Sequence, residues 1–370
     1  MEQRREFVML FEQEGVNRRA LCRRFGISPE TGYALVRRYR AAGNAGLIDR
    51  SRRPKRSPSR TSEAMEALVL ELRDQHPAWG GRKIARRLRD LGYEGVPSAS
   101  TVTEILRRHQ RLDAAMSAAR EPPQRFERAA PNALWQMDFK GHFPLARGRC
   151  HPLTVLDDHS RYALGVRACG DETEGTVRSE LAAIFRRYGL PQQMLMDNGS
   201  PWGSSHAEHR YTRFEVWLMA LGIAVVHGRP YHPQTQGKDE RFHRTLAAEA
   251  IGRRYFADLA DCQRRFDDWR LVYNTERPHE AIELATPIAR YRPSERPFPE
   301  KLEPFDYGDG ASLRRVDGDG WLSFHRRPLK LGRAFIGQQV ALRPALPDGC
   351  FDVFFCGHNV ARFDLNEAAP

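Results

Sequence analysis

The chain has few cysteines and no hydrophobic run long enough to span a membrane. Its six cysteines include no Cys-x-x-Cys pair, which excludes a disulfide scaffold and a zinc module built on that spacing. The longest nearly apolar run, residues 216–226, is shorter than the ~18 residues that suggest a membrane-spanning helix. The first 20 residues are charged throughout and lack the apolar centre of a secretory signal. We therefore expect a reduced cytosolic protein.

A surplus of positive charge is present, and almost all of it lies in the first third of the chain. The formal net charge is +12, and residues 1–130 hold 27 Lys and Arg against 16 Asp and Glu. Residues 131–370 are therefore nearly neutral. This asymmetry is typical of a segment that binds a polyanion joined to a segment with a different task. Apolar residues make up 41% of the chain, so it can form cores and is not a disordered protein.

Residues 1–45 carry the cap and turn signals of a helix-turn-helix unit. Asn17 is suited to cap a helix that ends before Gly26, and Ser28 followed by Pro29 marks the start of the next helix. In that motif the second helix enters the major groove of DNA. The positive charge favours this reading over an ordinary helical hairpin. The expected DNA contacts are Thr31, Tyr33, Arg37 and Arg38.

A basic segment and a second helical unit follow. Residues 46–61 are rich in Arg, Pro and Ser, which predicts an extended linker that follows DNA phosphates, with a solubilising spacer as the alternative. Residues 62–110 predict three helices of a second DNA-binding domain, the third with Thr101 and Glu104 at capping-box spacing. Residues 111–130 predict another linker. The expected DNA contacts in these segments are Arg52, Arg53, Lys55, Arg56, Arg82, Lys83 and Arg86.

From residue 131 the pattern changes to strands that alternate with helices. The predicted strands are 134–139, 151–156, 162–166, 193–196 and 223–226. The predicted helices are 173–188, 213–221, one that begins at 236, and 259–273. This order fits an α/β layer fold with a mixed sheet.

Three acidic residues in this region occupy positions that suit a metal site. Asp138 lies in the first predicted strand, Asp197 directly follows an apolar strand, and Glu240 lies in the first turns of a helix. Carboxylates brought together from strands and a helix suit a hard divalent cation such as magnesium. Two such ions stabilise the attacking and the departing oxygen in phosphodiester chemistry. Because the chain has 47 acidic residues, the same pattern is also compatible with ordinary surface charges.

The segments around these carboxylates carry a more specific pattern. They read, in order, Trp135-Gln-Met-Asp-Phe, Leu156-Asp-Asp-His-Ser-Arg-Tyr, Met196-Asp-Asn-Gly-Ser-Pro-Trp, His232-Pro-Gln-Thr-Gln-Gly-Lys-Asp-Glu-Arg-Phe-His-Arg-Thr-Leu and Tyr273-Asn-Thr-Glu-Arg-Pro-His. Together they resemble the integrase catalytic core of bacterial insertion-sequence transposases, the DDE relatives of retroviral integrases. The resemblance covers about residues 131–295, and the fourth motif is the most specific one.

The resemblance implies an RNase H-like fold in which Asp138, Asp197 and Glu240 hold two magnesium ions, with manganese as a possible substitute. It also implies double-stranded DNA as the partner, both terminal inverted repeats and target DNA, and a homo-oligomer that brings two ends together in a synaptic complex. The protein would then work at the bacterial nucleoid. Lys238 and Arg244, near Glu240, are expected to bind the DNA end.

One interval departs from the family pattern. Asp138 and Asp197 have 58 residues between them, and Asp197 and Glu240 have 42, which is longer than the family usually shows. A surface insertion within residues 203–212 would explain the difference at little thermodynamic cost.

Several neighbouring residues have less specific expected roles. Asp157 and Asp158 are expected to hold the end of a strand, and the Arg277-Pro-His motif to close the last core helix. His232 and His243 remain open between a contact with DNA and a structural role. Asp239 is not expected to share a metal pair with Glu240, because adjacent helix residues point about 100° apart.

The carboxyl end predicts an accessory domain. Residues 296–310 are proline-rich and read as a linker, and short alternating strands in residues 311–370 predict a small β-barrel, SH3-like as in similar integrases. The whole chain is therefore expected to be multidomain: all-α helix-turn-helix units, a central α/β RNase H-like integrase core, and this small barrel.

The resulting functional prediction is a DNA transposase that binds the terminal inverted repeats of its own insertion sequence. Water would cleave one strand at the element's end, and the freed 3′-hydroxyl would attack the target DNA. A catalytically inactive DNA-binding regulator derived from a transposase is the main alternative. An RNase H-type nuclease that cuts RNA–DNA hybrids would explain the core but not two DNA-binding units.

Overall fold

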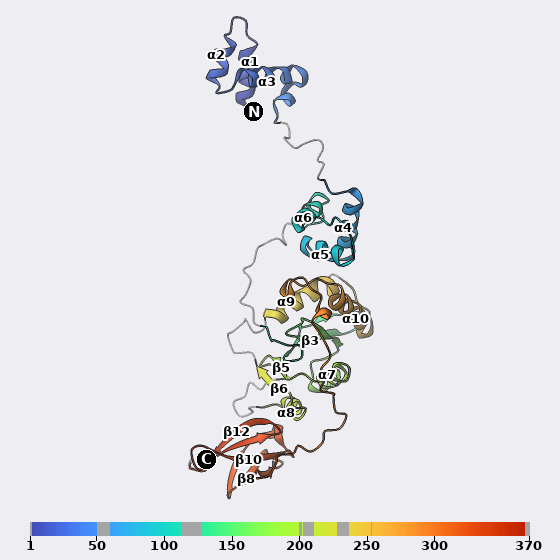
Figure 1. Cartoon of the computed structure of the whole chain (residues 1–370), viewed down its shortest axis with the longest axis vertical. Helices are drawn as coiled ribbons and strands as arrows, with labels where there is room; N and C mark the ends of the chain where they lie inside the picture. The colour runs from blue at the N-terminus through green and yellow to red at the C-terminus, as the bar shows by residue number, and fades with distance from the viewer. Residues whose placement is uncertain are drawn as a thin grey trace. The chain divides into compact units, whose positions relative to one another are not determined.

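The computed structural model describes residues 2–49, 60–112, 127–199, 202, 211–227, 237–252 and 254–366 (Figure 1). The chain divides into two compact units, residues 1–61 and residues 62–370. No helix within the described ranges is both long and apolar enough to cross a membrane. The predicted DNA contacts Arg52, Arg53, Lys55 and Arg56, together with the candidate His232, lie outside the described residues.

The first unit is a helical domain that contains the predicted helix-turn-helix. Its elements are α1 (Glu2–Phe11), α2 (Arg18–Arg24), α3 (Pro29–Ala42) and a short 3-10 turn, η1 (Gly43–Leu47). Asn17 and Ser28 cap α2 and α3 through their side chains, as predicted. The sequence reading did not define α1, whose Phe7, Val8 and Phe11 are buried in the core of this unit. Helix α1 thus completes a three-helix core.

Gly32 has a packing role in α3 rather than a place on its DNA-facing surface. A Cβ atom at this position would lie 2.7 Å from Cys22 Sγ and 2.9 Å from the Phe7 ring. Since that separation is too short for carbon against sulfur, only glycine lets α3 approach the other helices this closely.

The second helical domain has the three predicted helices. They are α4 (Glu63–Gln75), α5 (Gly81–Asp90) and α6 (Ala99–Arg108). The predicted capping box at Thr101 is wrong, because the N-cap of α6 is Ser98 and its hydroxyl accepts from the Thr101 N–H. Several Ser and Thr residues in succession made the cap position ambiguous in the sequence.

The central domain is built on a six-stranded mixed sheet. Its strands are β1 (Trp135–Phe139), β2 (Phe143–Pro144), β3 (Arg149–Asp157), β4 (Ala163–Cys169), β5 (Gln193–Met196) and β6 (Ala224–His227). The order is β2-β3-β1-β5-β6, and β4 also pairs with β3. Strands β1, β3 and β4 are antiparallel, whereas β1, β5 and β6 run parallel to one another. This mixed sheet agrees with the predicted α/β layer fold.

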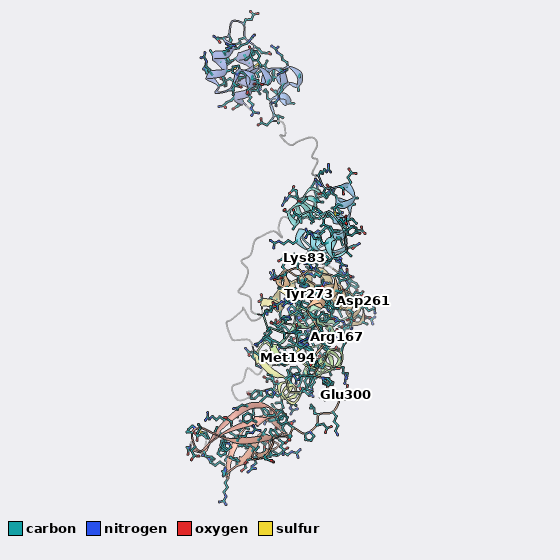
Figure 2. All side chains as sticks on the ribbon, viewed as in Figure 1. Lys83, Arg167, Met194, Asp261, Tyr273 and Glu300 are labelled. Atoms are coloured by element: carbon teal, nitrogen blue, oxygen red, sulfur yellow. The ribbon has the colours of Figure 1, made fainter. Side chains whose placement is uncertain are left out.

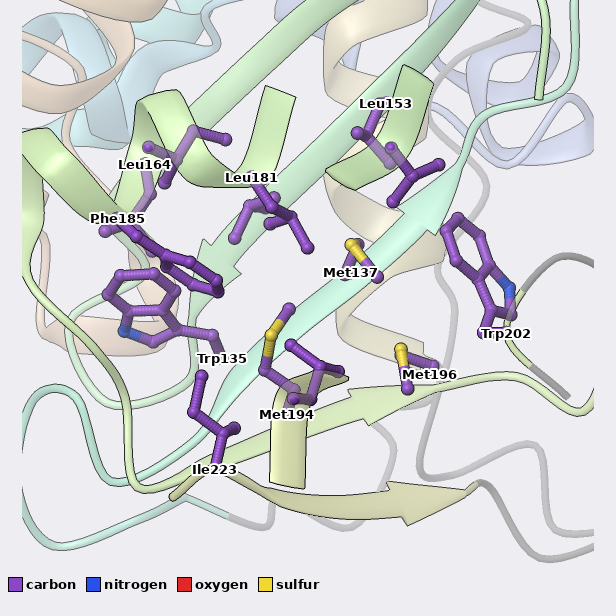
Figure 3. Close-up of a cluster of buried hydrophobic side chains, with 14 of the residues drawn as sticks. Trp135, Met137, Leu153, Leu164, Leu181, Phe185, Met194, Met196, Trp202 and Ile223 are labelled. Atoms are coloured by element: carbon purple, nitrogen blue, oxygen red, sulfur yellow. The ribbon is translucent and has the colours of Figure 1, made fainter. Parts of the chain in front are cut away.

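Helices cover both faces of this sheet. They are α7 (Glu174–Tyr188), α8 (Arg213–Ala220), α9 (Gly237–Leu246), the π-helical turn η4 (Ala247–Ile251) and α10 (Leu259–Thr275). Apolar side chains of β1 and β5 pack with α7 and α8, among them Trp135, Phe185 and Met194 (Figure 3). Side chains of β3 and β4 pack with α9 and α10 in a second cluster that includes Phe242 and Phe266. The sheet is therefore the middle layer of three.

Residues on both sides of the predicted core limits are hydrogen-bonded to the core domain. Arg128, placed in a linker by the sequence reading, donates its backbone N–H to Asp158 Oδ2 at 2.8 Å. Arg296, the first residue of the next predicted linker, donates from its guanidinium to the carbonyl oxygens of Pro191, Leu221 and Gly222. Two short 3-10 turns, η5 (Glu280–Ile282) and η6 (Pro287–Ala289), precede it.

The carboxyl end forms small antiparallel sheets, in line with the predicted β domain. The strands are β7 (Ser312–Arg315), β8 (Trp321–Phe324), β9 (Arg327–Lys330), β10 (Gln339–Ala345), β11 (Cys350–Phe355) and β12 (His358–Asp364), with a 3-10 turn, η7 (Arg333–Phe335). They make a four-stranded sheet in the order β12-β11-β10-β7 and a β8-β9 hairpin. Three of these strands, β7, β8 and β9, have only four residues each.

Candidate active site

Two neighbouring parallel strands bring Asp138 and Asp197 together. In the pairing of β1 with β5, Trp135 lies opposite Met194 and Gln136 opposite Leu195. Continuing that register by two residues sets Asp138 level with Asp197, which directly follows β5. Neighbouring strands are about 4.8 Å apart, so two carboxylates at this edge interact strongly. The pairing of β1 with β5 therefore brings two of the three predicted metal ligands together.

The electrostatic state of Asp138 reflects this proximity. Burial of the carboxyl, together with the nearby charge of Asp197, raises the pKa of Asp138 to about 7. A hydrogen bond from the Phe139 backbone opposes that rise but does not cancel it. Asp197 is partly exposed, and its Oδ1 accepts from the Gly199 N–H at 2.9 Å. A divalent cation between two such carboxylates would relieve both the burial of charge and their mutual repulsion.

Helix α9 presents its two adjacent acidic residues in different environments. Asp239 is only 4% exposed, and its pKa is raised well above the usual range by burial and then by Asp138 and Asp158. Glu240, the predicted third ligand, is exposed. Within the described ranges no group of three His, Cys, Asp or Glu residues lies close enough to hold a metal ion. The structure thus brings Asp138 and Asp197 together and does not bring Glu240 to them.

His243 connects α9 to the strand side of the site. Thr154 Oγ1 donates to the Asp138 carbonyl oxygen at 2.9 Å and lies 2.8 Å from His243 Nε2. Since the hydroxyl has one hydrogen, the Nε2–H of His243 must donate to it. Nδ1 then lies 3.9 Å from Asp138 Oδ2, and burial lowers the pKa of His243 to about 4. His243 is therefore a neutral residue in this structure and lies beside the acidic pair.

Asp157 and Asp158 stabilise the end of β3, as predicted. Both are fully buried. Asp157 accepts from the Asn132 N–H and from Ser160, and Asp158 accepts from the Arg128 N–H and the Gln136 side chain. The Lys238 ammonium forms an ion pair with Asp158, and burial lowers the pKa of Lys238. The predicted DNA contact Lys238 thus has a structural partner, whereas Arg244 is exposed.

The Arg277-Pro-His motif closes the last core helix, as predicted. The Arg277 guanidinium lies 3.0 Å from Glu249 Oε1, and both side chains are nearly buried. His279 packs edge-on against the ring of Tyr273, at 4.4 Å between ring centroids. This motif therefore holds α10 against the turn that follows α9.

Two further polar residues near Asp197 were missed by the sequence reading. His227 Nδ1 lies 2.9 Å from the Asp197 carbonyl oxygen, and His227 Nε2 lies 2.7 Å from Glu215 Oε1. The hydrogen bond with Glu215 raises the pKa of His227. Thr212 and Glu215 form a capping box at the start of α8. Their Thr-x-x-Glu spacing was a readable signal in the sequence.

The first unit leaves part of its predicted DNA surface open. Thr31 and Arg37 are exposed, and Tyr33 is 50% exposed with its ring against Phe11. Arg38 is partly buried and donates to the carbonyl oxygen of Ile48, so it also holds the end of this unit together. The exposed residues remain predictions of DNA contact.

Two basic residues of α5, Arg82 and Arg87, lie near acidic residues of the core, while the Arg82 side chain stays largely exposed. Arg87 forms an ion pair with Glu276 at 2.6 Å, and Arg82 lies 3.9 Å from Glu280. Lys83 is labelled in Figure 2. Burial, with a smaller contribution from nearby Arg277, lowers the pKa of Lys83 to about 8. A further predicted contact, Arg86, pairs with Asp90 within α5 at 2.7 Å. Lys83 is therefore partly buried, and Arg82, Lys83 and Arg86 remain predictions of DNA contact.

Known families match most segments of the chain. The Integrase core domain matches residues 128–233, and a second family of the same description matches residues 221–287. The C-terminal domain of the IS481 family transposases matches residues 311–370. A Homeodomain-like domain matches residues 31–106, and a Helix-turn-helix domain matches residues 3–55. These matches and the three-layer core confirm the predicted multidomain layout with an RNase H-like integrase core.

Individual relatives point to mobile elements. The insertion element IS476 uncharacterized 39.2 kDa protein of Xanthomonas euvesicatoria is 29% identical over 68% of this chain and 72% of its own length. The insertion element IS407 uncharacterized 31.7 kDa protein of Burkholderia multivorans is 27% identical over 43% of this chain. The chain spans 54% of that protein and 6% of the Gag-Pro-Pol polyprotein of squirrel monkey retrovirus, which is 32% identical.

A solved structure is also similar. The catalytic core domain of BIV integrase shares 24% sequence identity, with coverage of 43% of this chain and 92% of that domain, at a TM-score of 0.32.

Proposed function

Because the chain belongs to the bacterial insertion-sequence transposases with a retroviral-integrase-type core, a class of polynucleotidyl transferases, we propose the specific reaction that it performs. It binds the terminal inverted repeats of its own insertion sequence and uses water to cleave a strand at each end. The freed 3′-hydroxyl then attacks a phosphodiester of the target DNA, which joins the element end to the target and releases the 3′-oxygen of the cut target strand. The observation that carries this proposal is the proximity of Asp138 and Asp197, which the register of β1 and β5 sets level with each other and which is close enough for Asp197 to raise the pKa of Asp138. Neighbouring carboxylates of this kind are the ligands that divalent cations prefer.

The donor set fits magnesium, with manganese as a substitute. Asp138 and Asp197 would hold the ions, and Glu240 would complete the set as α9 moves toward the strands. When bound, two divalent cations neutralise the phosphate charge and favour attack by water or by a 3′-hydroxyl. The protein's own residues would bind the ions, orient the DNA end and exclude competing water. No protein side chain acts as a covalent nucleophile in this proposal.

The helical domains would recognise the DNA sequence. In the first unit, Thr31 and Arg37 lie exposed on α3, the second helix of the helix-turn-helix. A recognition helix presents such residues to base edges and phosphates in the major groove. A homo-oligomer would bring two element ends together, each bound by its own helical domains.

A joining assay tests this proposal. Purified protein is mixed with Mg²⁺ and labelled DNA that ends in the terminal repeat of the element. We expect nicking at the repeat end and joined products with wild-type protein, and neither product with Asp197→Asn. Retention of both products by Asp197→Asn would contradict the metal-binding role of this residue.

The same assay separates the alternatives. A regulator without catalysis would shift the terminal-repeat DNA in a gel without cutting it in Mg²⁺. An RNase H-type nuclease would cut a labelled RNA–DNA hybrid and leave the DNA ends unjoined. The proposed transposase joins the DNA ends and leaves the hybrid intact.

A further inference from the structure

The side chain of His227 forms a hydrogen bond with the backbone of Asp197. His227 is the last residue of β6 and lies opposite Met196 in the parallel pairing with β5. Its Nδ1 lies 2.9 Å from the carbonyl oxygen of Asp197. A carbonyl oxygen has no hydrogen, so the Nδ1–H of His227 donates to it. This bond links the two residues at the points where the chain leaves β5 and β6.

Glu215 fixes the orientation of the His227 ring. The Glu215 side chain is 3% exposed, and its Oε1 lies 2.7 Å from His227 Nε2. Its second oxygen accepts from the Thr212 N–H, while the Thr212 hydroxyl accepts from the Glu215 N–H. Because both of its oxygens are engaged, Glu215 holds the imidazole of His227 in one orientation.

The same turn of α8 also holds the segment that follows Asp197. Thr212 Oγ1 donates to the Trp202 carbonyl oxygen at 3.2 Å. The Trp202 ring is buried and stacks on Phe139, with 5.2 Å between the ring centroids. Phe139 directly follows Asp138 in β1. The first turn of α8 therefore contacts the backbone of Trp202 directly and the backbone of Asp197 through His227.

We propose that His227 and Glu215 are positioning residues that hold Asp197 in the direction in which it binds a divalent cation together with Asp138. This inference rests on the function proposed above. Neither residue reaches the metal or the DNA in this account; both act through the backbone of Asp197. Groups behind a ligand usually set its orientation, and their loss costs about 10- to 100-fold in metal affinity or activity.

Two substitutions of His227 separate its two hydrogen bonds. The amide of His227→Asn lies where Nδ1 lay and can still donate to Asp197, whereas the amide of His227→Gln lies where Nε2 lay and reaches only Glu215. His358 is a matched control, because it lines the same pocket of about 340 Å³ beside Glu215 and His227. His358→Gln changes the same residue type in that pocket without touching Asp197.

The first readout needs neither metal nor DNA. The Gly199 N–H donates to Asp197 Oδ1, so its hydrogen exchange reports how firmly the Asp197 carboxylate is held. We expect exchange at Gly199 to be faster by about 10-fold in full-length His227→Gln, and to be nearly unchanged in His227→Asn and His358→Gln. A merely structural loss would instead raise exchange across β5 and β6 together.

The second readout is the affinity for Mn²⁺, measured by calorimetry on the full-length protein without DNA. We expect His227→Gln to weaken Mn²⁺ binding by about 10-fold, and Glu215→Gln to weaken it in the same direction. His227→Asn and His358→Gln should bind as the wild type does. Thermal unfolding of each variant shows that it is folded.

The outcomes distinguish this inference from the proposed function. If the wild type binds Mn²⁺ and joins DNA while His227→Gln matches it in exchange and affinity, the positioning role is wrong and the proposed function stands. If the wild type neither binds Mn²⁺ nor joins DNA, the proposed function fails, and the metal-binding role of the positioning pair fails with it. In that case, faster exchange at Gly199 in His227→Gln would show only that His227 holds Asp197 in place, without a role in metal binding.

Discussion

The sheet and helix α9 hold the acidic residues of the candidate site in different ways. Asp138 and Asp197 lie on neighbouring strands whose register sets them side by side. Asp239 and Glu240 are adjacent on α9, yet the first is buried near Asp138 and the second is exposed. A strand pairing fixes a side chain through hydrogen bonds along the strand, whereas the residue that a helix presents depends on how the helix packs. We infer that the strands hold Asp138 and Asp197 in place before a metal ion binds, and that α9 contributes its ligand only when the metal ion is bound.

The largest expected effect comes from removing either carboxylate on the strands, Asp138 or Asp197. We expect Asp138→Asn and Asp197→Asn to reduce strand joining by more than about 100-fold, because loss of a ligand costs more than loss of a residue behind it. The measurement is the initial rate of joining in Mg²⁺ and in Mn²⁺. A variant that keeps a tenth or more of the wild-type rate would show that its carboxylate is dispensable.

The second prediction concerns stability without metal. The pKa of Asp138 is raised to about 7, so the folded protein holds this proton more tightly than the unfolded chain does. The stability of the metal-free protein should therefore fall as pH rises from about 4 through about 7, and Asp138→Asn should lack this loss. We expect the variant to be more stable at pH 8 by about 2 kcal/mol, a value reduced for the partial exposure of the side chain.

This pH effect is measured by urea unfolding of wild type and Asp138→Asn at several pH values in the presence of a chelator. The difference between the two proteins isolates Asp138, since the lowered pKa of His243 acts on both and with the opposite sign. A difference that stays constant from pH 4.5 to pH 8 would mean that Asp138 is not destabilised by burial.

The third prediction compares the two adjacent residues of α9 by stability. Asp239 is buried with a strongly raised pKa, so Asp239→Asn should stabilise the metal-free protein by about 1 kcal/mol or more at neutral pH. Glu240 is exposed, and Glu240→Gln should change the unfolding free energy by less than about 0.5 kcal/mol. Equal effects of the two variants would contradict the difference in burial between the two residues.

The smallest expected effect is at Thr154, through which α9 contacts the strands. Thr154 Oγ1 lies between the Asp138 carbonyl oxygen and His243 Nε2. Thr154→Val should destabilise the protein by about 1 kcal/mol, because it leaves a buried His243 N–H without this acceptor. Thr154→Ser keeps the hydroxyl and serves as the control. If the Ser and Val variants unfold alike, the hydroxyl does not link α9 to the strands.

Local signals in the sequence correctly predicted a strand, two helix caps and a buried acidic pair. The strand at 193–196 has the predicted bounds, and the caps at Asn17 and Ser28 are where side chains and turn residues indicated. Such features depend on a few consecutive residues. The buried pair Asp157 and Asp158 was also interpreted correctly as strand-end structure, because both follow an apolar strand directly.

Features that depend on packing could not be read in the same way. Charge alone suggested that Lys83 contacts DNA, but the sequence could not show that the fold partly buries this side chain and thereby lowers its pKa. The sequence likewise gives no sign that Asp239 rather than Glu240 is buried, since the rotation of α9 is set by Phe242 and Leu246 in the core. The His227 contact with Asp197 joins two strands that are 30 residues apart in sequence.

The central claim is that Glu240 completes the metal site that Asp138 and Asp197 begin. The most direct test compares Asp239→Asn and Glu240→Gln in one joining assay with terminal-repeat DNA and Mg²⁺. These are matched acid-to-amide changes on adjacent residues of the same helix. Our account predicts that Glu240→Gln loses joining by more than about 100-fold while Asp239→Asn stays within a few-fold of the wild type. Loss of joining in Asp239→Asn with activity retained in Glu240→Gln would contradict it.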